Sequence, residues 1–132
     1  MSNSPAILLV DDDDVFLTVV ESMVQMLGLP VMKAHNGIEA ITIFKEHAND
    51  IGCVILDIHM PRMNGIETFR YLKEMRENVQ VIIVSGYLDE ANLAQINPLH
   101  PAGNLQKPIT FQTLSALLVK CLPTTDFSKK LT

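Results

Sequence analysis

The chain has 132 residues, of which 48% are hydrophobic, and 15 acidic against 10 basic residues give a net charge of −5. This length and apolar content suit a single globular domain with its own core, and they exclude a disordered chain. The basic residues are scattered and form no stripe interleaved with aromatics, which argues against direct nucleic-acid binding.

The first residues, Met1-Ser2-Asn3-Ser4-Pro5, lack a basic stretch followed by an apolar one, so no signal peptide is expected. Charged or turn residues interrupt every later apolar run before it reaches the length of a membrane span. No membrane association is therefore expected, and these features together predict a cytoplasmic protein.

Five short apolar runs along the chain predict β-strands. They cover residues 7–10, 30–34, 53–56, 81–84 and, more weakly, 103–105. Several are almost wholly apolar, which is typical of parallel strands covered by helices on both faces. Cys53 lies in the third run and Cys121 in the last helical pattern. The two cysteines have no metal-ligand spacing, so both are expected to be small core residues.

Amphipathic segments between the runs predict helices. In the first, Val15, Val19, Met23 and Leu27 recur every four residues, and Gly28 follows as a stop. This recurrence predicts an apolar helical stripe.

The second helical pattern has Ile41, Phe44 and Ala48 on one face. Asn36 precedes it and Asn64 precedes the third pattern, each with Glu three residues later, as in a capping box. Both asparagines are therefore predicted to cap a helix.

The fourth helical pattern, residues 88–96, is short and is broken by two prolines within residues 97–101. In the last helix, Thr110 is the predicted cap and Pro123 ends the helix. Its apolar stripe consists of Phe111, Leu114, Leu117, Leu118 and Cys121. The polar residues 124–132 predict a disordered tail.

Five strand–helix units joined by right-handed crossovers predict an α/β fold. The expected architecture is flavodoxin-like, a doubly wound five-stranded parallel sheet with strand order 2-1-3-4-5. One domain is expected over residues 1–123. In this order the switch point, where ligands bind, lies between the first and third strands.

Acidic residues stand at that predicted switch point. Asp11 and Asp12 follow the first strand, and Asp57 ends the third. Carboxylates gathered at one sheet edge repel one another, and a hard divalent cation such as Mg²⁺ commonly relieves this repulsion. The pattern therefore points to phosphate chemistry.

Each candidate has an ordinary explanation when it is taken alone. The acidic run could be a solvated loop whose Asp13 or Asp14 caps the first helix. Ser85, after the fourth strand, could be turn punctuation, and Lys107, after the fifth, a surface lysine. Because the predicted topology brings these positions to one edge together with the aspartates, we favour a functional site.

This set closely resembles the receiver domain of two-component response regulators, the CheY-like superfamily, over residues 7–122. The motifs that carry the resemblance are Asp11, Asp12, Asp57, Met60-Pro61, Asn64-Gly65, Ser85 and Lys107-Pro108. The resemblance implies that Asp57 is the phosphoacceptor, forming an acyl phosphate. It also implies Mg²⁺ held by Asp12, Asp57 and the backbone carbonyl of His59, with Asp11 acting mostly through water.

Further roles follow from the same resemblance. Lys107 would pair with a phosphoryl oxygen, and the Lys-Pro step after it is often cis. The Ser85 hydroxyl would move to bond the phosphate and so shift the surface formed by the fourth helix and fifth strand. His59 and Tyr87 are expected to modulate the lifetime of the phosphate by controlling water access.

The resemblance also implies partners. The phosphoryl donor would be a histidine kinase or a histidine phosphotransfer protein, and a downstream protein would read the altered surface. The chain would be a monomer or weak homodimer in a two-component system or phosphorelay. It would be no enzyme beyond promoting its own phosphorylation and dephosphorylation. A stand-alone regulator, a relay intermediate and a receiver from a hybrid kinase all fit the sequence.

One position departs from the family pattern. Asn104 stands three residues before the lysine, where receivers usually carry Tyr or Phe as a moving aromatic. Asn104 mildly favours an alternative function, a degenerate receiver that acts as a phosphorylation-independent interaction module. The intact aspartates, Ser85 and Lys107 argue against that alternative.

Overall fold

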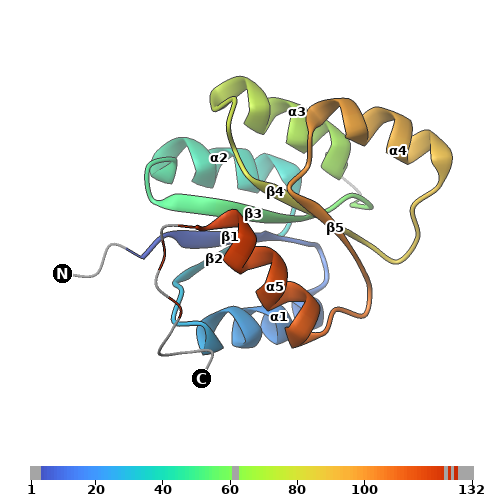
Figure 1. The fold of residues 1–132 in the computed structure, drawn as a ribbon. Helices are drawn as coiled ribbons and strands as arrows, with labels where there is room; N and C mark the ends of the chain where they lie inside the picture. The colour runs from blue at the N-terminus through green and yellow to red at the C-terminus, as the bar shows by residue number, and fades with distance from the viewer. Residues whose placement is uncertain (1–3, 61–62, 124, 126, 128–132) are drawn as a thin grey trace.

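The computed structural model describes residues 4–60, 63–123, 125 and 127, in which strands and helices alternate (Figure 1). The strands are β1 (Ala6–Val10), β2 (Val31–Ala34), β3 (Ile51–Asp57), β4 (Val81–Ser85) and β5 (Gly103–Gln106). The helices are α1 (Asp14–Met26), α2 (Gly37–His47), α3 (Gly65–Met75), α4 (Glu90–Ile96) and α5 (Phe111–Cys121), with a 3₁₀ turn at Asn97–Leu99.

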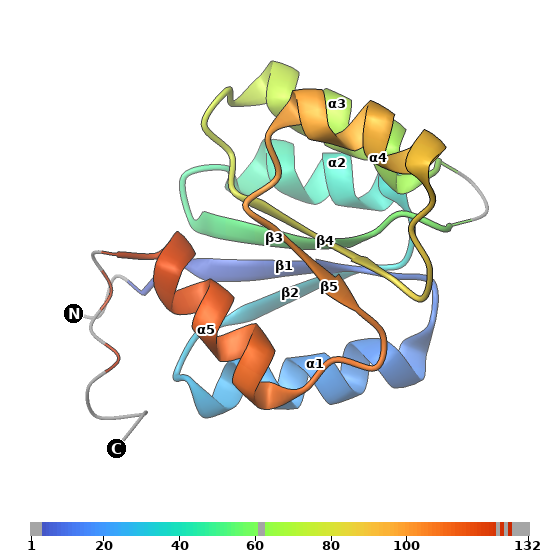
Figure 2. The same cartoon turned by 45° about the vertical axis from the view of Figure 1, so that its right-hand side comes forward.

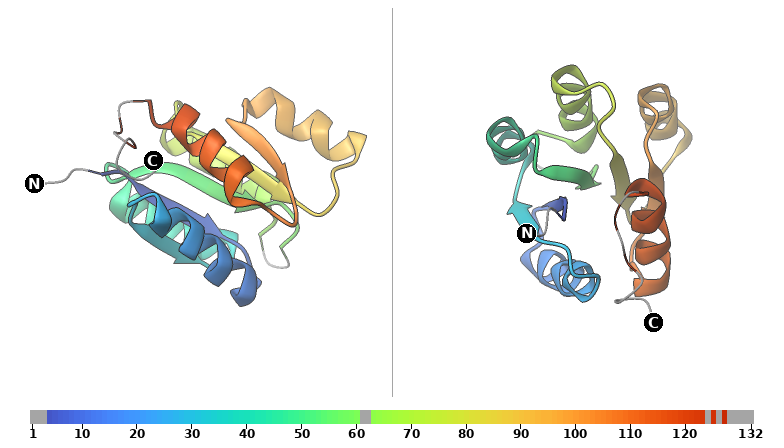
Figure 3. Two further views of the ribbon diagram at one scale, coloured as in Figure 1. Left: turned by 60° about the horizontal axis from the view of Figure 1, so that its bottom comes forward. Right: turned by 60° about the vertical axis from the view of Figure 1, so that its left-hand side comes forward.

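All strand pairs are parallel, and the sheet order is β2-β1-β3-β4-β5, which confirms the predicted topology. Helices α1 and α5 cover one face of the sheet, and α2, α3 and α4 cover the other (Figures 1 and 2). The end-on view in Figure 3 shows the same three layers. A sheet covered on both faces explains why its central strands are continuous apolar runs.

Each face of the sheet has its own core. Alternate residues of β1 point to opposite sides, so Ile7 and Leu9 join the α1/α5 core while Leu8 and Val10 join the other. Helix α5 contributes Leu114 and Leu118 to the first core, whereas Phe44, Phe69 and Leu72 anchor α2 and α3 in the second. Packing on both faces holds the sheet in place and therefore positions the loops that follow its strands.

The buried face of α1 differs from the predicted stripe. Val15 and Val19 are 72% and 48% exposed, whereas Leu17, Val20 and Val24 are buried. Residues four positions apart on a helix differ in direction by about 40°. Over the three steps from Leu27 back to Val15, the predicted stripe therefore turns from the buried side of α1 to the exposed side. The mixed spacing of three and four residues keeps the buried set on one side.

The second helix follows its prediction only in part. Phe44 is fully buried, but Ile41 and Ala48 are only partly buried, and Ala40 takes a core position instead. Residues 40 and 44 lie one turn apart on the same side of the helix, facing the sheet.

The predicted helix ends are largely confirmed. Asn36, Asn64 and Thr110 each accept a hydrogen bond from a backbone N–H in the first turn of the following helix. Asp13 is the cap of α1, and Gly28, with φ of 80°, follows that helix. These caps set where each helix begins relative to the strand before it.

The segment expected to be a disordered tail is described only at two positions. Phe127 is buried against the α1/α5 core, and Thr125 donates a hydrogen bond to the carbonyl of Leu122. The rest of residues 124–132 lies outside the described residues. Within the described ranges, no helix is long and apolar enough to cross a membrane.

Candidate functional site

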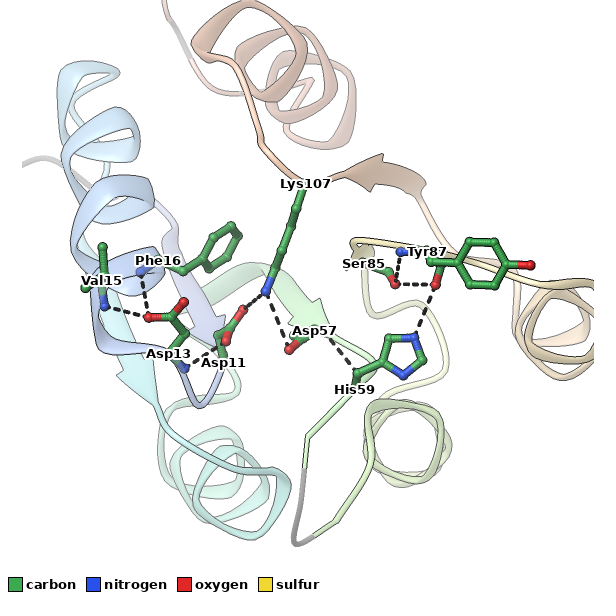
Figure 4. A network of polar contacts seen from close by, with 9 residues as sticks. All are labelled: Asp11, Asp13, Val15, Phe16, Asp57, His59, Ser85, Tyr87 and Lys107. Carbon is green, nitrogen blue, oxygen red and sulfur yellow. Dashed lines mark hydrogen bonds and ion pairs between the residues drawn. The ribbon is translucent and has the colours of Figure 1, made fainter.

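The polar residues singled out in the sequence meet at the carboxyl edge of the sheet (Figure 4). Asp11 and Asp12 follow β1, Asp57 ends β3, Ser85 ends β4, and Lys107 follows β5. Because the parallel strands all end at this edge, residues up to 96 positions apart come into contact there.

Three carboxylates form the centre of the site. Asp11 and Asp57 are buried and Asp12 is exposed, and one carboxylate oxygen from each lies within 4.8 Å of the others. Burial raises the pKa of Asp57, and the negative charge of Asp11 adds to this effect, while a hydrogen bond from the His59 amide opposes it. A cluster of oxygen donors that repel one another suits a hard divalent cation.

Lys107 supplies positive charge to this cluster. Its Nζ donates a hydrogen bond of 2.9 Å to Asp11 Oδ2 and lies 3.7 Å from Asp57 Oδ2. Burial alone would lower the pKa of Lys107, but the hydrogen bond to Asp11 and the charge of Asp57 raise it. The lysine thus remains cationic between two buried carboxylates.

An aromatic ring also holds the lysine, and sequence reasoning missed it. The Nζ of Lys107 lies 4.3 Å from the centroid of the Phe16 ring, in the first turn of α1. A cation over an aromatic face is attracted electrostatically, so Phe16 helps to orient the ammonium group. No spacing in the sequence links Phe16 to Lys107, because the contact depends on how the start of α1 lies against the loop between β5 and α5.

Local backbone structure positions each acidic side chain. Asp11 Oδ1 accepts a hydrogen bond of 2.9 Å from the Asp13 amide, and Asp57 Oδ1 accepts one of 3.1 Å from the His59 amide. A β-carbon at Gly65 would lie 2.4 Å from the Asp57 carbonyl oxygen. Glycine is therefore required for α3 to begin so close to the end of β3. The Lys107-Pro108 bond is cis, as the resemblance suggested.

Ser85 is buried at the same edge, but its hydroxyl forms hydrogen bonds with the loop between β4 and α4. The hydroxyl donates a hydrogen bond of 2.6 Å to the Tyr87 carbonyl and accepts one of 3.0 Å from the Tyr87 amide. His59 Nε2 lies 3.2 Å from the same carbonyl oxygen, so Ser85, Tyr87 and His59 form one network (Figure 4). The Tyr87 side chain itself is 70% exposed.

Asn104 borders a cavity next to Ser85. The cavity has a volume of about 280 Å³ and is lined by Ser85, Tyr87, Leu88, Asn104, Leu105 and Gln106. Asn104 lies on β5 opposite Ile83 and is exposed. No aromatic ring from β5 fills this space.

A second hollow lies on the other side of the lysine. It has a volume of about 410 Å³, and its walls include Val15, Phe16, Val19, Pro108 and Ile109. The two exposed valines of α1 therefore face an apolar depression that borders Lys107.

A family model and known proteins both match this chain over most of its length. A family model described as "Response regulator receiver domain" matches residues 7–119. The chain is 34% identical over 117 residues to the autoinducer 1 sensor kinase/phosphatase LuxN of Vibrio campbellii, covering 89% of this chain. It is 29% identical over 126 residues to the sensor kinase CckA of Brucella abortus, covering 96% of this chain. In both cases it spans only 13% of the length of the relative.

Solved structures share the fold. A response regulator receiver domain protein from Clostridium thermocellum superposes with a TM-score of 0.85 at 29% identity, over 90% of this chain and 94% of that one. A chain of the CheX-CheY-BeF3-Mg²⁺ complex from Borrelia burgdorferi gives a TM-score of 0.83 at 25% identity, over 88% of this chain and 87% of that one.

Proposed function

The chain belongs to the response regulator receiver domain family of two-component signalling, and on that premise we propose that it accepts a phosphoryl group on Asp57. The observation that carries the proposal is the meeting of Asp57 with Asp11, Asp12 and Lys107 at one sheet edge. The carboxylates can bind the cation, and the positive charge of Lys107 suits an incoming phosphoryl group.

In the proposed reaction an Oδ atom of Asp57 attacks phosphorus in line. The bond between phosphorus and the imidazole nitrogen of a phosphohistidine breaks, and the imidazole leaves with the electron pair. The product is an acyl phosphate on Asp57. Lys107, already 3.7 Å from the Asp57 carboxylate, then pairs with a phosphoryl oxygen.

Receiver domains generally bind Mg²⁺ through acidic residues, and the three clustered carboxylates fit that role. We propose that Asp12, Asp57 and the His59 backbone carbonyl hold the ion, with Asp11 acting mostly through water. Mg²⁺ also occurs in the Borrelia complex that the chain resembles. When bound, the ion reduces the repulsion between the anionic carboxylate and the anionic phosphoryl group.

The signal would leave the site through the β4–α4 loop. For its hydroxyl to reach the phosphoryl group, Ser85 must give up both hydrogen bonds to Tyr87. The loop would then be released and the surface of α4 and β5 would shift between two states. His59 shares the Tyr87 carbonyl, so we propose that His59 and Tyr87 together control water access. The rate at which the phosphoryl group is lost measures this control.

Asn104→Tyr is expected to change partner coupling more than phosphorylation rate. A tyrosine there would add a ring beside the 280 Å³ cavity, which Asp57 does not line. The measurement compares the rate of phosphoryl uptake with the change in downstream-partner affinity on phosphorylation. Equal effects on both would contradict the separation of chemistry from output.

The donor would be a histidine kinase or histidine phosphotransfer protein. The apolar hollow beside Lys107, with the exposed Val15 and Val19, offers such a donor a surface next to the phosphoacceptor. We also propose a cytoplasmic receiver domain over residues 1–123, monomeric or weakly dimeric, that acts on a downstream protein and catalyses only its own phosphorylation and dephosphorylation. Binding to nucleic acid or membranes forms no part of this proposal.

Incubation with acetyl phosphate and Mg²⁺ tests the proposal. Intact-protein mass spectrometry is expected to show a single phosphoryl adduct, which is absent when EDTA removes the metal. The second candidate, a phosphorylation-independent interaction module, is favoured by Asn104 alone. It would gain support if Mg²⁺ bound but neither acetyl phosphate nor a phosphorylated histidine protein gave an adduct.

A further inference from the structure

The two cysteines, 68 positions apart in the sequence, are neighbours in the fold. Cys53 lies in β3 and is fully buried in the α1/α5 core. Cys121, the last residue of α5, is partly buried and packs against the same core. The two thiols are close enough for each to shift the pKa of the other.

The backbones around them are also packed closely. A β-carbon at Gly52 would lie 2.8 Å from Leu122 Cδ2 and 2.6 Å from Pro5 Cβ. The end of α5 therefore approaches the start of β3 because residue 52 has no side chain. Figure 2 shows this end of α5 beside the amino ends of the strands, away from the phosphoryl site.

The environments of the two thiols differ. The neighbouring Cys121 thiol and burial raise the pKa of Cys53. The neighbouring Cys53 thiol lowers the pKa of Cys121, and the nearby positive charge of Lys120 acts in the same direction against partial burial. Both shifts favour the thiolate on the partly exposed Cys121 over a thiolate on the buried Cys53.

We propose that Cys121 and Cys53 form an oxidant-sensitive dithiol site whose co-reactant is hydrogen peroxide. The Cys121 thiolate attacks a peroxide oxygen, the O–O bond breaks, and hydroxide leaves to take up a proton as water. The Cys53 sulfur then attacks the sulfenic sulfur of Cys121. The S–S bond forms, and the Cys53 proton leaves with the sulfenic hydroxyl as a second water. Two thiols are oxidised to a disulfide and one peroxide is reduced to two waters.

The disulfide would tie the C-terminal end of α5 to the start of β3. Cys121 stands at a helix C-terminus, where the helix dipole opposes a thiolate, so oxidation is expected to need excess peroxide. A cross-link over this long a loop restricts the unfolded chain, so the oxidised protein should melt at a higher temperature than the reduced protein.

Intact-mass analysis of peroxide-treated protein tests the site. The expected product has lost two hydrogen atoms, no longer reacts with maleimide, and regains both thiols with dithiothreitol. Proteolysis without reductant should yield a Cys53–Cys121 linked peptide. Cys53→Ala should stop at a Cys121 sulfenic acid that dimedone traps, and Cys121→Ser should leave Cys53 unreacted.

The peptide map of wild-type protein decides the matter whether or not the variants fold. A sulfinic acid without a linked peptide, an intermolecular dimer only, or no reaction with excess peroxide would each overturn the proposal. The readout involves no phosphoryl transfer, so its outcome is independent of the function proposed for Asp57.

Discussion

Asp57→Asn is expected to abolish phosphoryl uptake and, at neutral pH, to make the protein more stable. Asparagine keeps the shape of the side chain and can still accept the His59 amide hydrogen bond. It removes the nucleophilic carboxylate, so no adduct should form with acetyl phosphate and Mg²⁺. It also removes a buried charge that lies close to Asp11.

The gain in stability should depend on pH. The pKa of Asp57 is raised in the folded protein, first by burial, so the folded state holds its proton more tightly than the unfolded state. Wild-type protein therefore loses stability as pH rises from the ordinary value of 3.8 through the raised folded value. The asparagine variant does not lose this stability. At pH values above this range, its free energy of unfolding is expected to exceed that of wild type by about 1–2 kcal/mol.

Urea unfolding in EDTA at pH 7 and at acid pH measures this difference. The gain in free energy of unfolding should disappear below about pH 3.8, where Asp57 is protonated in both the folded and the unfolded protein. Asp50→Asn is a matched control, because Asp50 is exposed and its replacement should change stability by no more than about 0.5 kcal/mol. A variant less stable than wild type at pH 7, or a gain that does not change with pH, would contradict the expectation.

The fold could be predicted because its signals are local. Continuous apolar runs mark buried parallel strands, and residues such as Asn36 and Asn64 mark helix starts by their side-chain chemistry. Once the strand order is known, the meeting of Asp11, Asp57 and Lys107 follows from topology. The candidate site therefore follows from the strand order and from the residues that end each strand.

Other features depend on packing, which a linear pattern does not contain. A regular four-residue spacing predicts that Val15 lies on the buried face of α1, but the packing of α1 against the sheet buries Leu17 and leaves Val15 exposed. The Phe16–Lys107 contact and the pairing of Cys53 with Cys121 have the same origin. Each joins elements whose relative position is set by packing in the α1/α5 core.

Lys107→Ala is expected to destabilise the metal-free protein by about 2–3 kcal/mol at neutral pH. The substitution removes the ammonium group that bonds Asp11 at 2.9 Å, and the Asp11 side chain is only 1% exposed. The buried carboxylates would lose their cation, and Phe16 would lose its partner. We place the effect below that of a fully buried pair because the lysine side chain is 28% exposed.

Lys33→Ala provides the matched control. Lys33 pairs with Glu21 at a similar 3.0 Å, but this pair is exposed, so its loss should cost no more than about 1 kcal/mol. Comparing the two variants by urea unfolding separates the effect of burying a charge pair from the effect of forming one. Equal losses in both variants would contradict the importance of burial at Asp11.

Magnesium should reverse much of the Lys107→Ala loss but none of the Lys33→Ala loss. If the ion and the lysine neutralise the same carboxylates, removing the lysine leaves a more negative site that binds the ion more tightly. Because the pKa of Lys107 is raised, its contribution is complete below 10.5 and disappears as pH rises through the folded value. The difference in free energy of unfolding between Lys107→Ala and wild type should therefore become smaller under two conditions. One is neutral pH with Mg²⁺ present, and the other is strong alkali without Mg²⁺. A difference that Mg²⁺ leaves unchanged would separate the lysine from the metal site and would limit Lys107 to a structural ion pair with Asp11.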